Sequence, residues 1–181
     1  MVWSTLHAVP PFVLACGDWS PPHAAISFFK IGGAAKGMRI AVIDGQGGGI
    51  GRVIVEKLRK ALPKDDVEII ALGTNAMAAA LMLKAGANDA ASGENAVIYN
   101  ADKVDIIVGT IAVLMPHSML GEFTPGMAEA VAKSPARKIL LHLNRSNVEI
   151  VGVVAEPLPH LIDFLVERVK TIMAARCAGQ G

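Results

Sequence analysis

The sequence has few aromatic residues, and this sets how its core is built. Only 4% of its 181 residues are Phe, Trp or Tyr, whereas 52% are hydrophobic. The core therefore has to consist mainly of Ala, Val, Ile, Leu and Met. A chain this apolar often has further surface to bury, so we expect a homo-oligomer.

The sequence also lacks an excess of one charge and lacks long apolar runs. Its 17 basic and 16 acidic residues leave a net charge of +1. This balance argues against a surface dedicated to nucleic acid or to anionic membranes. No apolar run reaches the roughly 18 residues of a membrane span. We therefore expect neither nucleic acid nor membrane as a partner.

Cysteine is nearly absent as well. Cys16 and Cys177 lie at opposite ends of the chain, where they form neither a disulfide framework nor a pair of metal ligands. The histidines show no metal-ligand spacing, so we expect no metal site. Such sparse cysteine suits a reducing compartment, and we expect a cytoplasmic protein.

The first 37 residues differ from the rest. They contain Pro10, Pro11, Pro21 and Pro22, both tryptophans and no clear hydrophobic period. An export signal is disfavoured because no basic residue precedes Lys30. We predict a disordered leader over residues 1–37, followed by one folded domain over residues 38–181.

The domain opens on an apolar run from Ile40 to Ile43, which predicts a buried strand ending at Asp44. Five of the next seven residues are glycines: Gly45, Gly47, Gly48, Gly49 and Gly51. Apolar residues at helical spacing follow from Ile50 to Leu62. A strand, a glycine loop and a helix in this order are typical of the start of a doubly wound nucleotide-binding fold.

The glycine spacing is G-x-x-x-G-x-G, from Gly45 through Gly49 to Gly51. It is neither G-x-G-x-x-G nor a Walker loop, since no Gly-Lys-Ser/Thr follows. It resembles the cofactor loop of short-chain dehydrogenases/reductases. Glycines let the backbone approach a phosphate, and the N–H groups at a helix start attract an anion. The alternative is a glycine-rich turn that only packs the helix against the strand.

The rest of the domain alternates between strands and helices. Strands are predicted at 67–72, 88–91, 104–108 and 138–143, and helices from about 75 to 86, from about 92, at 124–132 and from 157. This alternation predicts an α/β, Rossmann-like doubly wound sheet that is mostly parallel. A further strand at 148–153 follows after four residues, too few for a crossover. It is predicted to be an antiparallel edge strand.

Four segments carry the most distinctive glycines and polar residues: Ala41–Gly51, Ala71–Asn75, Ser118–Glu122 and Leu143–Arg145. Through them the chain resembles, from Met38 to about Met173, a bacterial family catalogued only as a domain of unknown function. The resemblance implies a Rossmann-like fold and no known activity.

Polar residues cluster at the predicted carboxyl ends of the strands, where open parallel sheets bind ligands. We predict a nucleotide site made of the glycine loop and these strand ends, with NAD or NADP as a possible cofactor and another nucleotide otherwise. Its residues are Asp44, Gly45, Gln46, Gly47, Gly48, Gly49, Ile50, Gly51, Thr74, Asn75, Thr110, Asn144 and Arg145.

Two features of this site leave its ligand open. Arg145 could pair with a phosphate or carboxylate, or it could be a solvated residue of a hairpin. Between Ala71 and Asn75 there is no Asp or Glu to bind a ribose and no Arg to bind a 2′-phosphate. This absence argues against ordinary NAD binding.

Catalytic residues are weakly indicated. His117 and Glu122 lie after the fourth strand, where they could act as acid or base or merely cap a helix. Tyr99 and Lys103 have the spacing of a short-chain dehydrogenase pair, but they precede the fourth strand, and we interpret the spacing as accidental. His142 alternates within a strand, which predicts a hydrogen-bonded core histidine.

The leading hypothesis is a nucleotide- or dinucleotide-binding protein that acts as a sensor or an accessory subunit. An alternative is a minimal NAD(P)-dependent oxidoreductase or nucleotide-sugar enzyme that uses His117 or Glu122. A third possibility is an interaction domain whose glycines serve packing only.

Overall fold

The computed structural model describes residues 37–143, 148–154 and 156–178. Except for Gly37, the predicted leader lies outside the described residues. The elements are β1 (Met38–Asp44), α1 (Gly49–Ala61), β2 (Val67–Gly73), α2 (Ala76–Lys84), β3 (Asp89–Ser92), α3 (Glu94–Ala101), β4 (Ile106–Thr110), the 3₁₀ helices η1 (Ile111–Leu114) and η2 (Met119–Gly121), α4 (Pro125–Lys133), β5 (Arg137–Leu141) and α5 (Leu158–Ala178).

The five strands form one parallel sheet in the order β3-β2-β1-β4-β5. The chain builds outward from β1 through β2 to β3 and then crosses back to place β4 on the other side of β1. The predicted Rossmann-like, doubly wound fold is therefore confirmed. None of the helices in the described residues is long and apolar enough to cross a membrane.

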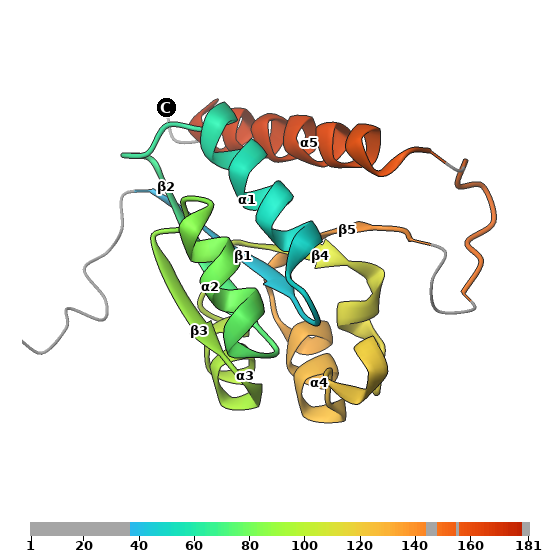
Figure 1. Ribbon diagram of the computed structural model, residues 1–181. Coiled ribbons are helices and arrows are strands. Elements are labelled where there is room, and N and C mark those ends of the chain that lie inside the picture. Colours follow the sequence, from blue (N-terminus) through green and yellow to red (C-terminus); the bar gives the residue numbers. More distant parts are fainter. Residues whose placement is uncertain (1–36, 144–147, 155, 179–181) are drawn as a thin grey trace, which may run out of the picture. The chain divides into compact units, whose positions relative to one another are not determined.

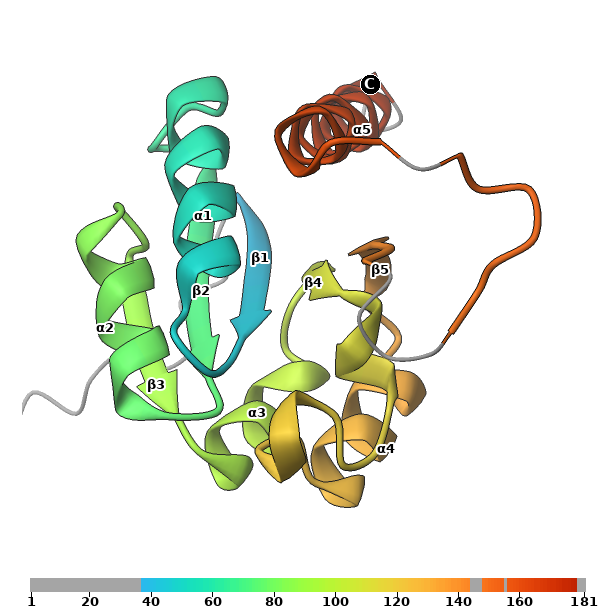
Figure 2. The same ribbon diagram turned by 45° about the vertical axis from the view of Figure 1, so that its right-hand side comes forward.

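Helices cover both faces of the sheet (Figures 1 and 2). Because successive side chains of a strand point to opposite faces, β1 divides its apolar residues between two cores. Ile40 and Val42 pack with residues of α1, α2 and α5, such as Leu58. Ala41 and Ile43 pack with α3 and α4 and with the buried Phe123. This two-sided burial explains why β1 reads as a continuous apolar run in the sequence.

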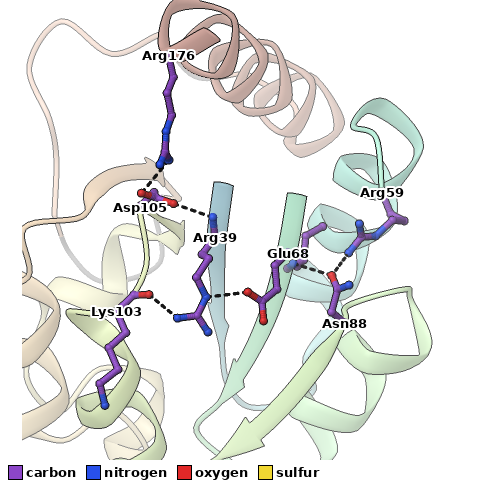
Figure 3. Close-up of polar contacts among 8 residues, drawn as sticks. Arg39, Arg59, Glu68, Asn88, Lys103, Asp105 and Arg176 are labelled. Atoms are coloured by element: carbon purple, nitrogen blue, oxygen red, sulfur yellow. Dashed lines mark hydrogen bonds and ion pairs between the residues drawn. The ribbon is translucent and has the colours of Figure 1, made fainter. Parts of the chain in front are cut away.

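The amino edge of the sheet is held by charged side chains (Figure 3). The backbone N–H of Arg39 donates to Asp105 Oδ2 at 2.8 Å, and Arg39 Nε donates to Glu68 Oε2 at 2.7 Å. Arg176 near the end of α5 pairs with Asp105 Oδ1 at 2.9 Å. These contacts join β1, β2 and α5 to the segment that leads into β4.

The same edge contains the Tyr99 and Lys103 pair. Lys103 Nζ lies 2.8 Å from the centroid of the Tyr99 ring, and the Lys103 carbonyl accepts a 2.8 Å hydrogen bond from Arg39 Nη1. Arg39 lies near the start of β1, whereas the glycine loop follows its end. The pair thus forms a cation–π contact at the edge opposite the glycine loop.

The predicted antiparallel edge strand at 148–153 is wrong. Within the described residues this segment forms no ladder, and the N–H of Val153 donates to the carbonyl of Ile150 at 3.2 Å to make a turn. Gly152 adopts a left-handed φ of 88°, which interrupts an extended backbone. The alternating apolar pattern is present in the sequence, but no strand of residues 37–143 or 156–178 pairs with this segment.

The start of α4 provides a test of the predicted helix cap. Thr124 Oγ1 accepts the N–H of Met127 at 3.2 Å and donates to Glu94 Oε1 at 2.5 Å, so the predicted cap is confirmed. Thr124→Ala should lower the free energy of unfolding by about 1 kcal/mol because that N–H loses its acceptor. Thr124→Ser should retain most of the free energy of unfolding, because serine keeps the hydroxyl that accepts this N–H. Urea unfolding of the three proteins measures the effect, and an equal loss in both variants would contradict the capping role.

Candidate functional site

A cavity of about 350 Å³ opens at the carboxyl edge of the sheet, beside the ends of β1 and β4. The strand order reverses between these two strands, which is where doubly wound folds bind ligands. Two of its polar lining groups are the buried side chains of Asp44 and Thr110. The cavity is lined by Asp44, Gln46, Ile50, Thr110, Ile111, Ala112, Met119, Leu120 and Leu143.

Asp44 connects the end of β1 to the first turn of α1. Its Oδ1 accepts the N–H of Gly45 at 2.9 Å, and its Oδ2 accepts the N–H of Gly51 at 2.6 Å. Burial raises the pKa of Asp44 above its usual value, although the backbone N–H groups act in the opposite direction and the Glu122 carboxylate adds to the rise. Since the residue before α1 is Gly48, which has no capping side chain, Asp44 serves as the acceptor for this helix start.

Three of the loop glycines are required by close packing. A Cβ on Gly45 would lie 2.5 Å from Thr74 Oγ1, and one on Gly51 would lie 2.5 Å from Met82 Sδ. Gly48 has a φ of 63°, and its Cβ would lie 2.6 Å from the Ala78 Cα. This position therefore requires glycine for two reasons, the left-handed backbone and the lack of space for a side chain.

Gly47 and Gly49 have no such packing role. A Cβ on either residue would meet no atom within 4 Å. Their N–H groups donate to no acceptor among the described residues. They lie at the start of α1, where the helix dipole favours negative charge. The loop thus combines glycines that pack with glycines that leave open space at a helix N-terminus.

Glu122 comes from the segment after β4 and reaches the end of β2. Its Oε2 accepts hydrogen bonds from Gln46 N at 2.8 Å, from Asn75 Nδ2 at 2.9 Å and from Thr74 Oγ1. The Thr74 hydroxyl, followed by the Gln46 N–H, lowers the pKa of Glu122 below its usual value. A carboxylate therefore lies where the sequence after β2 offered none.

Asn75 links the same elements. Its Oδ1 accepts the N–H of Ala78 at 2.9 Å, which caps α2, while its Nδ2 donates to the Gln46 carbonyl at 3.0 Å. The N–H of Thr74 donates to the Asp44 carbonyl at 3.0 Å. The glycine loop, the start of α2 and Glu122 thus form one hydrogen-bonded unit.

Backbone strain concentrates in the segment over the cavity. His117, Met119 and Leu120 have φ values of 61°, 57° and 60°, a left-handed conformation that non-glycine residues rarely adopt. Each such residue costs of order 1–2 kcal/mol. The buried Phe123 anchors the segment, whereas Leu120 is 95% exposed and borders the cavity. Strain of this kind clusters at ligand sites.

The structure brings most of the predicted site residues together. Asp44, Gln46, Ile50 and Thr110 line the cavity, and Gly45, Thr74 and Asn75 surround Glu122. His117 is exposed and does not line the cavity, and its backbone N–H donates to the Phe123 carbonyl at 2.8 Å. Asn144 and Arg145 lie outside the described residues.

Sequence reasoning missed the apolar wall of the cavity. This wall comes from Ile111, Ala112, Met119, Leu120 and Leu143. The position of the first two directly after Thr110 was an available signal, because they follow the carboxyl end of a strand. Within the part of the chain that the structure describes, no three His, Cys, Asp or Glu side chains could hold a metal ion, and no Lys or Arg lines the cavity.

Comparison with known proteins gives one match. The family model described as Domain of unknown function (DUF3842) matches residues 39–174. No curated protein and no solved structure matches the chain.

The two classes of glycine predict opposite effects on stability. Gly49→Ala should raise the free energy of unfolding by about 0.4–1 kcal/mol, because it stiffens the unfolded chain and its Cβ meets open space. Gly51→Ala should lower it by about 1–3 kcal/mol, because its Cβ would lie 2.7 Å from the Asp44 Cβ. Denaturant unfolding without ligand tests both, and a destabilised Gly49→Ala would show that Gly49 serves packing.

Glu122 should give the stability a specific pH dependence. Because its folded pKa lies below the usual value of 4.5, the ionised group contributes stability that is present above that value and lost as the pH falls through the folded pKa. The difference in free energy of unfolding between wild type and Glu122→Gln should therefore shrink on acidification below about pH 4.5. A difference that stays constant from neutral to acid pH would contradict this.

Proposed function

The chain belongs to the family described as Domain of unknown function (DUF3842), and from the geometry of its site we propose that it binds a nucleotide through the glycine loop. NAD is the first candidate ligand. The protein would act as a sensor or accessory subunit that responds to the bound nucleotide.

The observation that carries this proposal is the open space at Gly47 and Gly49. Both lie at the N-terminus of α1, and their N–H groups have no acceptor among the described residues. Free N–H groups at a helix start are a favourable site for a phosphate. The interaction-domain alternative, in which the glycines only pack, gives no reason for glycine at these two positions.

The cavity beside the loop supports a ligand that carries a ring. Its volume of about 350 Å³ is near the lower end of the range of small-molecule sites, roughly 300–1,000 Å³. Ile50, Ile111 and Leu143 give it apolar walls, while Asp44 and Thr110 offer hydrogen-bonding groups. A cavity of this size suits one ring with its sugar, and the remainder of a dinucleotide would lie over the glycine loop.

Glu122 supports NAD rather than NADP. In dinucleotide-binding folds, an acid near the end of β2 accepts hydrogen bonds from ribose hydroxyls. The Glu122 carboxylate lies on Thr74 and Asn75 at that strand end, and its Oε1 accepts from none of the described residues. A carboxylate there would repel a 2′-phosphate.

Asp44 supports a second candidate function, a minimal oxidoreductase or nucleotide-sugar enzyme. A buried acid whose pKa is raised, in a cavity, is a typical general acid or base. Of the predicted catalytic residues, Glu122 is held as a carboxylate by three donors, and His117 does not line the cavity. Proton transfer at this site would therefore fall to Asp44.

Calorimetric titration with NAD, NADP, ATP and a nucleotide sugar tests the binding proposal. We expect the wild type to bind NAD more tightly than NADP. Gly49→Val should lose at least about tenfold in affinity, because its side chain would occupy the space of the phosphate, while the protein stays folded. Glu122→Gln should reduce the preference for NAD over NADP.

The control is Ala132→Val, which places the same valine side chain at an exposed position near the end of α4, at the amino edge of the sheet. It should leave nucleotide affinity unchanged. If the wild type binds none of the four ligands, the nucleotide proposal is wrong. If Gly49→Val binds as tightly as the wild type, the phosphate does not lie at the start of α1.

A further inference from the structure

Residues 148–154, which we name the arm, carry exposed apolar side chains that no other described residue covers. Val151 is 97% exposed and Val154 is 75% exposed. Both ribbon views show residues 148–154 running outside the sheet (Figures 1 and 2). Valines gathered on so short a segment are expected to be covered by protein.

A free sheet edge lies beside the arm. β5 is the last strand of the sheet and pairs only with β4 among the described residues. Within the described residues, its other side therefore has backbone N–H and C=O groups with no ladder partner, and Ile139 and Leu140 on its two faces are only partly buried. An edge of this kind is a template for the addition of another strand.

The opposite edge of the sheet is different. β3 has only four residues, and its first and last, Asp89 and Ser92, are exposed and polar. Short, polar edge strands resist pairing with other chains. Strand addition is therefore favoured at β5 and not at β3.

A hollow lies between the arm and the rest of its own chain. It measures about 270 Å³ and is lined in part by His142, Ile150, Val153 and Leu161. The Nδ1 atom of His142 is buried and has no hydrogen-bond partner among the described residues, and the residue as a whole is only half-buried, so the expectation of a hydrogen-bonded core histidine is wrong. An unsatisfied buried polar atom is costly, so a group from outside this part of the chain is expected to reach it.

The inner face of α5 cannot provide the contact between copies. Leu165 and Val169, which carry the apolar period of this helix, are buried against the chain's own core. The exposed valines of the arm and the β5 edge offer a surface for self-association instead. Charge also favours this pairing, because Arg137 at the start of β5 is exposed while Glu149 and Glu156 lie within and beyond the arm.

We propose that the turn between Ile150 and Val153 opens, that the arm of one copy then adds as a strand to the free edge of β5 in a second copy, and that the reciprocal contact closes a two-fold dimer. The same partner would then cover the exposed valines, pair with the β5 edge and fill the hollow. Closed, isologous dimers satisfy both arms and leave no edge free for further growth.

The test measures the mass of the full-length protein by light scattering at micromolar concentrations. We expect a dimer for the wild type. The double variant Val151→Asp/Val154→Asp should weaken dimerisation by at least about tenfold, because it buries two charges. Both side chains are exposed within one chain, so circular dichroism should show an intact fold. Phe164→Asp, at an exposed position on α5, is the matched control and should remain dimeric.

Hydrogen–deuterium exchange separates strand addition from other dimers. Amides of residues 139–141 and 148–154 should be protected in the wild type and lose protection in the double variant. A monomeric wild type would overturn the proposal, as would a dimer that the arm substitutions leave intact. A dimer whose β5 amides exchange freely would also overturn it. A monomer with a protected arm would show that the arm pairs with its own β5.

Discussion

The hydrogen bonds from Gly45 and Gly51 to the Asp44 carboxylate fix the geometry on which the site depends. A buried carboxylate is costly unless donors surround it, and the start of α1 supplies them. In return, Asp44 sets where α1 begins relative to the end of β1. With that junction fixed, Gly48 takes its left-handed conformation against Ala78. The N–H groups of Gly47 and Gly49 are left without an acceptor among the described residues.

Glu122 completes the site from the other side, and the two carboxylates have opposite environments. Burial raises the pKa of Asp44, whereas hydrogen bonds from Thr74 and Gln46 lower the pKa of Glu122. Both carboxylates accept hydrogen bonds, but for Asp44 the effect of burial on the pKa outweighs that of its backbone donors. A phosphate bound at the start of α1 would add a further negative charge near Asp44 and raise its pKa again.

The parts of this site that sequence reasoning could predict are those fixed by local pattern. The apolar run before Asp44 and the glycines after it define a strand, a turn and a helix, and parallel strands bring Asp44 and Thr110 to the same edge. Glu122 stands in the sequence as a weak catalytic candidate, but its place at the end of β2 could not be predicted, because its contact with Thr74 joins residues 48 positions apart. No local signal shows that the loop after β4 returns to the end of β2. The sequence correctly indicates that no acid directly follows β2. The fold nevertheless places the Glu122 carboxylate there, from the segment after β4.

The wrong prediction at residues 148–153 has a related cause, since a strand pattern specifies an extended, half-buried segment but not the strand that pairs with it. Among the described residues of one chain, no strand pairs with this segment, and Val151 is almost fully exposed. If the β5 edge of a second copy pairs with this segment, the strand pattern of residues 148–153 agrees with the fold. Leu143 lines both the nucleotide cavity and the hollow beside the arm. A partner's arm at this edge would therefore lie close to the cavity, so dimer formation and nucleotide binding would share one wall.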